Sequence, residues 1–246
     1  MKNIKKKIAI IGSGIAGLSS AWLLSKKFDV TIFEANNYPG GHANTVSIPV
    51  NDELIDVDVG FIVHNNINYP NFVKLLKHFH IPTKKSSMSF SVSINNGQYE
   101  YASFLPFGPF VQISNLYRER FIRMLIEIPK FYKFANNFDF KRCNNKLTVE
   151  NFLNVGGFSR YYTYDHLLPM ASAIWSQPIS KILDFDAETF IEFYKNHGLL
   201  RFRDRPKWKT IDGGSKTYIN KVLSDFDGKL YLSSPVSRVS REDGII

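Results

Sequence analysis

The sequence predicts an α/β fold: a first domain built on a parallel sheet, interrupted by an inserted α+β domain. An apolar, β-branched run at Lys7–Ile11 leads directly into a G-x-G-x-x-G pattern. A helix-like segment and a second strand-like run follow, and this second run ends on an acid, Glu34. After a long aromatic-rich middle section, short strand-like runs return near residues 208–239. The first domain is therefore expected to be discontinuous.

The opening segment has the order of a βαβ unit of the Rossmann type. Lys7–Ile11 is typical of a strand buried on both faces. The pattern predicts a helix over Ile15–Lys26 and a second strand over Val30–Phe33. Leu18, Trp22 and Leu23 are the helix residues expected to face the sheet.

Each glycine of the turn has a separate expected role. Gly12 permits the tight turn from strand to helix, Gly14 lets the backbone approach a pyrophosphate, and Gly17 lets helix and strand pack closely. The helix N-terminus offers unpaired N–H groups to phosphates. Glu34, at the tip of the second strand, would accept hydrogen bonds from ribose hydroxyls and repel a 2′-phosphate, which disfavours an NADP-type ligand.

A secretory signal is the alternative for this segment, because lysines precede the apolar run Ile8–Leu24. The regular spacing of the glycines and the ordered second strand speak against it. A glycine-rich turn in an ordinary α/β protein is the remaining structural alternative.

The residues after Glu34 read E-A-x-x-x-x-G-G, with Ala35 next to the acid and a glycine pair at Gly40-Gly41. This segment resembles the flavin-binding fingerprint of FAD-dependent amine oxidases, phytoene desaturases and their relatives. His42 stands where flavin amine oxidases usually have arginine. With "GGHANTV", "AIWSQP" and "WKTIDGGSKTYINKV", it resembles the predicted NAD/FAD-binding branch of that superfamily. That branch is similar to a flavoprotein portion joined to some cyclopropane-fatty-acid synthases, which hints at lipid chemistry.

The resemblance implies a Rossmann-like FAD-binding domain over 1–65 plus 208–246 and a substrate or cap domain over 66–207. It implies that the Gly-Gly turn and the glycine of Asp58-Val59-Gly60 lie near the cofactor, and that the Val236 backbone pairs with adenine. The expected cofactor-binding residues are Gly12, Ser13, Gly14, Ile15, Ala16, Gly17, Glu34, Ala35, Gly40, Gly41, His42, Gly60 and Val236.

Further elements follow from periodicity and turn residues. Strands are expected at Val46–Pro49 and Glu53–Val57, at Ser87–Ile94 and Gln98–Ala102, and at Trp208–Ile211, Lys229–Leu232 and Val236–Val239. Helices are expected around Phe72–Phe79 and Phe121–Ile128, the latter bent or ended near Pro129, and at Ala187–Asn196 and Lys216–Leu223. Asp186 and Gly198 would cap the helix at Ala187–Asn196.

Composition limits the classes of partner. The 246 residues are 44% hydrophobic and contain no uninterrupted apolar run long enough to span a membrane. Cys143 is the single cysteine, which excludes an internal disulfide and fits a cytoplasmic location. The histidines lack metal-site spacing, so no metal is expected. The net charge of +9 comes without a nucleic-acid motif. The basic stretch 201–209 is either a solvated loop or a contact to an anion or a membrane surface.

The sequence thus predicts an FAD-dependent, amine oxidase-like oxidoreductase that transfers a hydride from an apolar or lipid-like small molecule. No catalytic residue is assigned; His64 and Lys216 are only guesses. Because relatives continue beyond this sequence into a C-terminal flavin-contacting segment, the chain resembles a truncated member. An FAD-binding scaffold or catalytically incomplete fragment, and an NAD-binding protein without flavin, stay open as alternatives.

Overall fold

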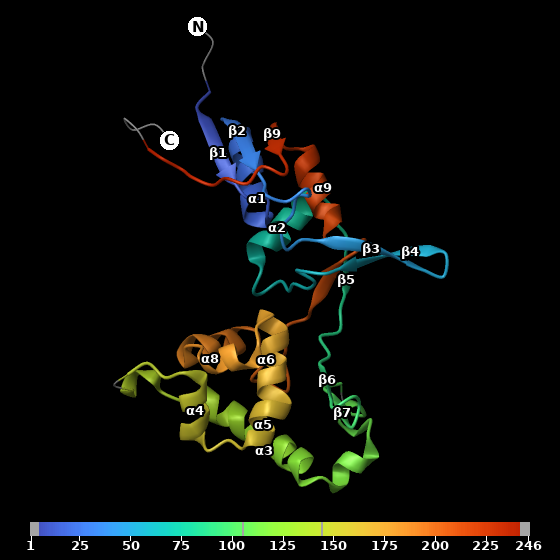
Figure 1. The fold of residues 1–246 in the computed structure, drawn as a ribbon, viewed down its shortest axis with the longest axis vertical. Coiled ribbons are helices and arrows are strands. Elements are labelled where there is room, and N and C mark those ends of the chain that lie inside the picture. The colour runs from blue at the N-terminus through green and yellow to red at the C-terminus, as the bar shows by residue number, and fades with distance from the viewer. Residues whose placement is uncertain (1–4, 105, 144, 242–246) are drawn as a thin grey trace. The chain divides into compact units, whose positions relative to one another are not determined.

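The computed structural model describes residues 5–104, 106–143 and 145–241. The chain forms two compact units (Figure 1). Unit 1 comprises the chain up to Ser86 and again from Lys207 onward, and unit 2 comprises Ser87–Pro206.

The centre of unit 1 is a parallel sheet with the strand order β1-β2-β9. Strand β1 (Lys7–Ile11) pairs with β2 (Asp29–Phe33), and β2 pairs with β9 (Gly228–Tyr231). Helix α1 (Ile15–Ser25) connects the first two strands, and α9 (Lys216–Ser224) precedes the third (Figure 1). The predicted α/β fold with its Rossmann-like βαβ unit is therefore confirmed.

The buried face of α1 repeats every third or fourth residue. Leu18, Ala21, Trp22 and Ser25 are buried, and the Trp22 indole Nε1 donates to Asp225 Oδ2 at 2.6 Å. The prediction that Leu23 faces the sheet is wrong, because this position lies off that face and its side chain is 60% exposed.

Unit 1 also contains two antiparallel strand pairs, one of which is a hairpin. Strands β3 (Thr45–Val50) and β4 (Glu53–Asp58) are antiparallel, joined through the expected turn, where Asn51 and Asp52 have φ angles of 48° and 67°. Strand β5 (Thr83–Lys85) pairs antiparallel with β8 (Lys209–Ile211).

The boundary between the units differs from the division predicted at residues 65 and 66. Helix α2 (Pro70–His78) and β5 belong to unit 1, because Leu76 and Ile81 are buried in its core and β5 pairs with β8. The inserted unit accordingly begins at Ser87.

The strand predicted at Val236–Val239 is absent from the described part of the chain. These residues follow β9 as irregular backbone, with Val236 39% and Val239 58% exposed. A β-branched run needs a neighbouring strand to form a ladder. Within the described residues the sheet ends at β9 on this side.

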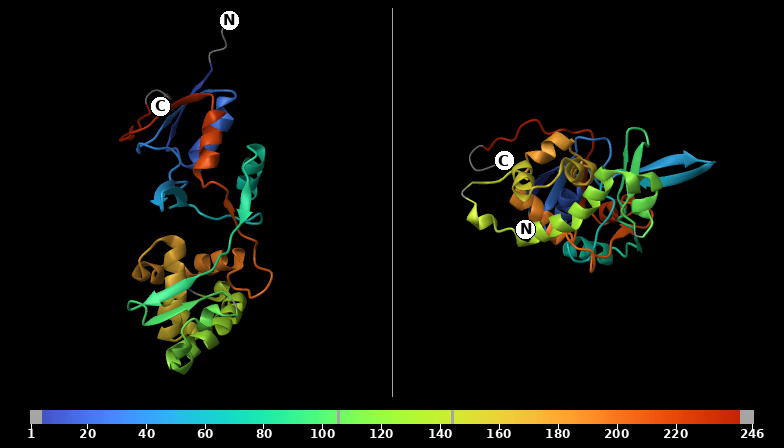
Figure 2. Two further views of the ribbon diagram at one scale, coloured as in Figure 1. Left: turned by 90° about the vertical axis from the view of Figure 1, so that its right-hand side faces the viewer. Right: turned by 90° about the horizontal axis from the view of Figure 1, so that it is seen from below.

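Unit 2 begins with a hairpin and continues as helices (Figure 2). Strands β6 (Ser91–Ile94) and β7 (Tyr99–Ala102) are joined at Asn95, Asn96 and Gly97, which all have positive φ. The strand predicted from Ser87 is therefore shorter than expected. The hairpin packs on α3 through one core that contains Val92, Tyr99, Tyr101, Phe121 and Met124.

The helical part of unit 2 surrounds a second, larger core. Its elements are η1 (Gly108–Phe110), η2 (Ile113–Tyr117), α3 (Glu119–Asn137), η3 (Phe140–Arg142), α4 (Val149–Gly156), α5 (Arg160–Tyr162), the π-helical turn η4 (Thr163–Leu167), α6 (Leu168–Trp175), α7 (Ile179–Leu183) and α8 (Ala187–Asn196). The N-cap of α8 is as predicted, since Asp186 Oδ1 accepts from the Thr189 N–H at 2.9 Å. The C-cap is His197 and not Gly198, which follows it with φ +67°.

Helix α3 does not end near Pro129 but continues to Asn137. Proline removes one intrahelical hydrogen bond, which costs about 3 kcal/mol in a helix interior. Phe121 and Met124 lie before the proline and Phe131 and Ala135 after it, all fully buried. Core packing on both sides thus keeps the helix continuous.

A buried polar cluster joins the hairpin of unit 2 to η4. Arg120 forms a bidentate pair with Asp165, at 2.7 and 2.9 Å, and the Tyr101 hydroxyl donates to the Asp165 carbonyl at 2.7 Å. Pro169 follows four residues later and has no N–H to offer that carbonyl, so Tyr101 satisfies it instead. The His166 Nδ1 lies 3.0 Å from the same hydroxyl.

This cluster makes stability depend on pH. Burial, with a smaller effect of Arg205, lowers the pKa of His166 to about 4. The unfolded chain therefore binds a proton below pH ~6.5 that the folded chain does not, and stability falls as the pH decreases through that value. Between pH 7 and 5.5 we expect a loss of about 1 kcal/mol from this residue.

Urea unfolding of the wild type and of His166→Gln at both pH values tests this expectation. The variant should lose about 1 kcal/mol less than the wild type over the interval, although its stability at pH 7 is lower. Equal losses in the two proteins would refute it. Carboxylates with lowered pKa values, such as Asp186, contribute only below about pH 5 and do not interfere.

Candidate nucleotide-binding site

The three glycines of the turn have the conformations that their predicted roles require. Gly12 has φ +90°, which favours glycine, and its N–H donates to the Phe33 carbonyl at 2.8 Å. A Cβ on Gly17 would collide with the Gly12 carbonyl oxygen and lie 3.4 Å from Ile10 Cγ2. A Cβ on Gly14 would meet nothing within 4 Å. Glycine is therefore favoured by backbone conformation at Gly12 and required by close packing at Gly17, whereas space is open at Gly14.

The N-terminus of α1 begins at this open position. Gly14 is the N-cap, with extended backbone at φ −60° and ψ 169°. No side chain among the described residues caps the helix, and its first turn has no acidic residue. The first N–H groups of a helix need partners and carry partial positive charge, so this end is suited to an anion.

Glu34 is held at the mouth of the turn. Its Oε2 accepts from the Ser13 N–H at 2.7 Å and from the Ser13 hydroxyl at 2.5 Å, and Oε1 accepts from the Asn36 N–H at 2.9 Å. Burial raises the pKa of the Glu34 carboxyl, but these hydrogen bonds outweigh burial and leave the pKa below its ordinary value. A charged acceptor thus lies next to the open turn, with Ser13 as a partner that the sequence pattern did not predict.

The glycine pair packs directly against the first turn. Gly40 forms an isolated parallel bridge with Gly14, and its N–H donates to the Ser13 carbonyl at 3.0 Å. Gly40 and Gly41 have φ angles of +116° and +58°, and a Cβ on Gly41 would lie 3.2 Å from Gly14 Cα. Both glycines are needed because one backbone segment lies against another.

Most of the remaining predicted residues lie near the turn. Ile15 and Ala16 line the cavity described below, and Ala35 directly follows Glu34. The backbone of His42 packs against Gly60, where an added Cβ would collide with the His42 carbonyl. Val236 lies apart from this group, on the segment after β9. That segment returns to the Glu34 end of the turn, where the Ser234 N–H donates to the Glu34 carbonyl at 2.7 Å.

Sequence reasoning missed a network that ties α9 to the β3–β4 hairpin. Asp58 Oδ1 accepts from the Thr45 hydroxyl at 2.6 Å and from the Ser215 N–H at 2.8 Å, and Thr45 Oγ1 accepts from the Lys216 N–H at 2.9 Å. Asp58 and Thr45 therefore cap α9 from another element. The predicted Asn51-Asp52 turn could have indicated the contact between Thr45 and Asp58. This turn sets the register of the hairpin, and that register places Thr45 opposite Asp58.

Removing this cap should destabilise unit 1. We expect Asp58→Ala to lower the free energy of unfolding by about 1–2 kcal/mol, as loss of a helix cap does. Asp56→Ala is the matched control: its carboxylate pairs with Lys216 at 2.6 Å on the surface, and such pairs contribute little. Chemical unfolding that gives equal losses for the two variants would contradict the capping role.

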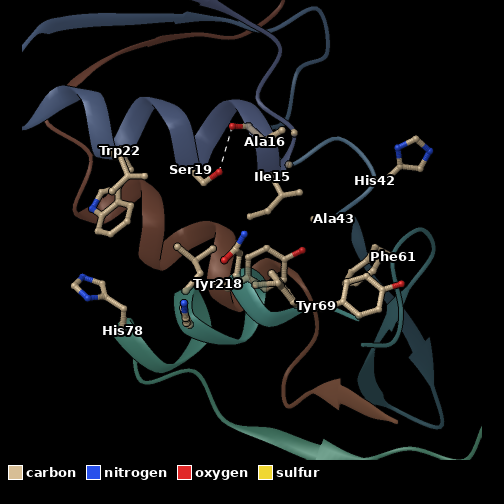
Figure 3. A pocket seen from close by; sticks show the side chains of 17 residues that line it. Ile15, Ala16, Ser19, Trp22, His42, Ala43, Phe61, Tyr69, His78 and Tyr218 are labelled. Atoms are coloured by element: carbon tan, nitrogen blue, oxygen red, sulfur yellow. Dashed lines mark hydrogen bonds between the residues drawn. The ribbon is translucent and has the colours of Figure 1, made fainter. Parts of the chain in front are cut away.

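A cavity of about 960 Å³ runs along α1 from the glycine turn. Gly14, Ile15 and Ala16 line one end and Trp22 the other. Figure 3 shows α1 on one side of the cavity, with side chains of α2 and α9, including His78 and Tyr218, on the other. The lining is mainly apolar, and the volume is within the range of small-molecule sites.

Neither guessed catalytic residue has a distinctive setting. His64 is buried against Phe72, with ring centroids 5.3 Å apart, and burial followed by the charge of Lys209 lowers its pKa. Lys216 forms the ion pair with Asp56. Within the described residues, no group of three or more histidine, cysteine or acidic residues could hold a metal ion, and no helix is long and apolar enough to cross a bilayer.

Comparison with known proteins agrees with this geometry. The family model for the "NAD(P)-binding Rossmann-like domain" matches residues 10–79. The chain is 62% identical over 39 residues to coproporphyrinogen III oxidase of Staphylococcus aureus, covering 15% of this chain and 8% of that protein. It is 58% identical over 43 residues to tryptophan 2-monooxygenase of Allorhizobium ampelinum, covering 17% and 6%.

The fold extends the similarity over almost the whole chain. A structure of putrescine oxidase with bound putrescine superposes with a TM-score of 0.62 at 16% identity. The match covers 94% of this chain and 51% of that one, so the chain spans about half the length of this structural relative and less of the curated ones.

Proposed function

We propose that this chain is a member of the flavoprotein superfamily of the FAD-dependent amine oxidases and protoporphyrinogen oxidases, and that its glycine turn binds the ADP half of FAD for an oxidoreductase reaction. The single observation that carries the proposal is the open position at Gly14. There, an uncapped helix N-terminus and a missing Cβ leave space, and the Glu34 carboxylate is bonded to Ser13, the residue before Gly14.

The chain's own residues would act by binding and orientation. The first N–H groups of α1 would donate to pyrophosphate oxygens. Glu34 would accept from a ribose hydroxyl once the Ser13 hydroxyl, the rotatable one of its donors, turns away from Oε2. The same carboxylate disfavours a ligand with a 2′-phosphate. The Gly40-Gly41 turn would bring backbone close to the pyrophosphate end, and Val236 would lie toward adenine.

When bound, flavin supplies two-electron chemistry by taking up a hydride equivalent from a C–H bond of the substrate. We propose an apolar, lipid-like substrate for the whole protein. The support is the resemblance to flavoprotein portions that accompany fatty-acid-modifying enzymes. No side chain of this chain is assigned as catalytic acid or base.

Identifying the released cofactor tests the proposal. The purified chain, reconstituted with FAD and freed of excess, should show flavin absorption bands and liberate FAD on heating, identified by its mass. A preparation that retains NAD and no flavin would overturn the FAD assignment. Anaerobic bleaching of the bound flavin by unsaturated fatty acids, but not by aliphatic amines, supports the lipid-like class; bleaching by amines alone rejects it.

A further inference from the structure

One end of unit 2 exposes a group of large apolar side chains, which we call the apolar patch. It consists of Phe104, Phe107, Val111, Ile113, Tyr117 and Ile126, whose side chains are between 50% and 88% exposed. Ile113 and Tyr117 belong to η2, Ile126 lies on α3, and the other three residues lie before or after η1. η1 contacts η2, and η2 contacts α3. Isolated exposed apolar residues are ordinary, but a continuous group marks an interaction surface.

Two polar side chains next to these apolar residues, Gln112 and Asn115, point inward. Asn115 is fully buried and its Nδ2 donates to the Glu100 carbonyl at 2.8 Å. Gln112 bonds the β6–β7 hairpin from both ends of its amide, donating to the Gly97 carbonyl at 2.6 Å and accepting from the Glu100 N–H at 2.9 Å. Loops in water usually have the opposite arrangement. The polar groups therefore fix the turns to the hairpin while the apolar groups face outward.

Most of the patch belongs to a segment without charge. The sequence has no charged residue from Tyr101 to Tyr117, and Arg118 and Glu119 follow immediately. Glu119 is exposed and pairs with Arg123 at 3.7 Å, so these two charges offset each other between Tyr117 and Ile126. Beyond Ile126, the exposed face of α3 continues with Lys130 and Lys133. The whole chain has a net charge of +9. An uncharged aromatic and aliphatic surface beside lysines matches the interface of a bilayer that contains anionic lipids.

We propose that the apolar patch docks this protein onto an anionic membrane surface. Phe107, Ile113 and Tyr117 enter the boundary between headgroups and acyl chains, and Lys130 and Lys133 lie at the level of the headgroups. The contact is peripheral and rests on the surface alone, so it is independent of the proposed cofactor.

Vesicle flotation of the full chain tests the proposal. We expect it to float with phosphatidylcholine vesicles that contain phosphatidylglycerol and to bind pure phosphatidylcholine more weakly. Phe107→Asp and Ile113→Asp should each weaken partition at least about tenfold, because an apolar group is lost from the interface and a charge is added. Val155→Asp is the control, since Val155 is 62% exposed on α4 outside the patch; it should change partition less than twofold.

Lys133→Glu separates the electrostatic part. It should reduce binding to phosphatidylglycerol-containing vesicles about fivefold or more and leave binding to phosphatidylcholine unchanged. Thermal melts of all variants should match the wild type. Failure of the wild type to float with either vesicle would overturn the proposal. So would sedimentation that shows a dimer dissociated by Phe107→Asp, since a second copy would then cover the patch.

Discussion

Gly14→Ala should abolish most cofactor binding without weakening the fold. The backbone at Gly14 is extended, a conformation that any residue adopts, and the added Cβ meets no atom within 4 Å. The methyl group would instead occupy the open space in front of α1, where phosphate oxygens are proposed to lie. Losing one charge-assisted hydrogen bond costs about 1.5–3 kcal/mol, so FAD should bind about 10- to 100-fold more weakly.

Titration of the apo-protein with FAD, followed by flavin fluorescence, measures this loss. The melting temperature without cofactor should remain within about 1 °C of the wild type, which follows from the empty space around the new methyl group. Unchanged FAD affinity in a folded Gly14→Ala variant would show that the opening at the turn is not the phosphate site. It would leave the fold assignment intact.

Gly17→Ala is expected to have the opposite effect, a loss of stability. The Cβ would strike the Gly12 carbonyl oxygen, which belongs to the backbone and cannot rotate away, and would crowd Ile10 on β1. Overpacking of this kind costs about 3 kcal/mol, which corresponds to a decrease of about 10 °C in melting temperature for a unit of this size.

Gly14→Ala is the matched control for this substitution, because both variants add one methyl group to the same turn. Thermal unfolding followed by circular dichroism should separate them clearly. If Gly17→Ala melted with the wild type, α1 would have to sit farther from β1 than the structure shows. If both variants melted early, the turn as a whole would tolerate no side chain.

The local parts of the fold could be predicted from the sequence. The βαβ unit rests on a glycine spacing and on strand and helix periods that act over a few residues, and β1, α1 and β2 appear where expected. Turns set by Asn51-Asp52 and Asn96-Gly97 were predictable for the same reason, since these residues adopt positive φ.

Features that depend on distant partners could not be predicted. Val236–Val239 has a strand-like composition but forms no strand. A strand needs a neighbouring strand to pair with, and the sequence periodicity does not show whether one is present. Helix α3 continues through Pro129 because its two halves are buried in two different cores. In the site, the glycines could be predicted from their spacing. The hydrogen bonds of Ser13 to Glu34 and of Ser215 on α9 to Asp58 could not, because each joins segments that are far apart in the sequence.

The position of β9 in the sheet has a consequence for synthesis. β2 can gain its second neighbour only after the ribosome has made Gly228–Tyr231, long after β1 and α1 have emerged. Unit 2 is complete well before that, since it ends at Pro206. The inserted unit can therefore reach its final packing during translation. Over the same period one edge of β2 remains unpaired, because β9 has not yet been synthesised.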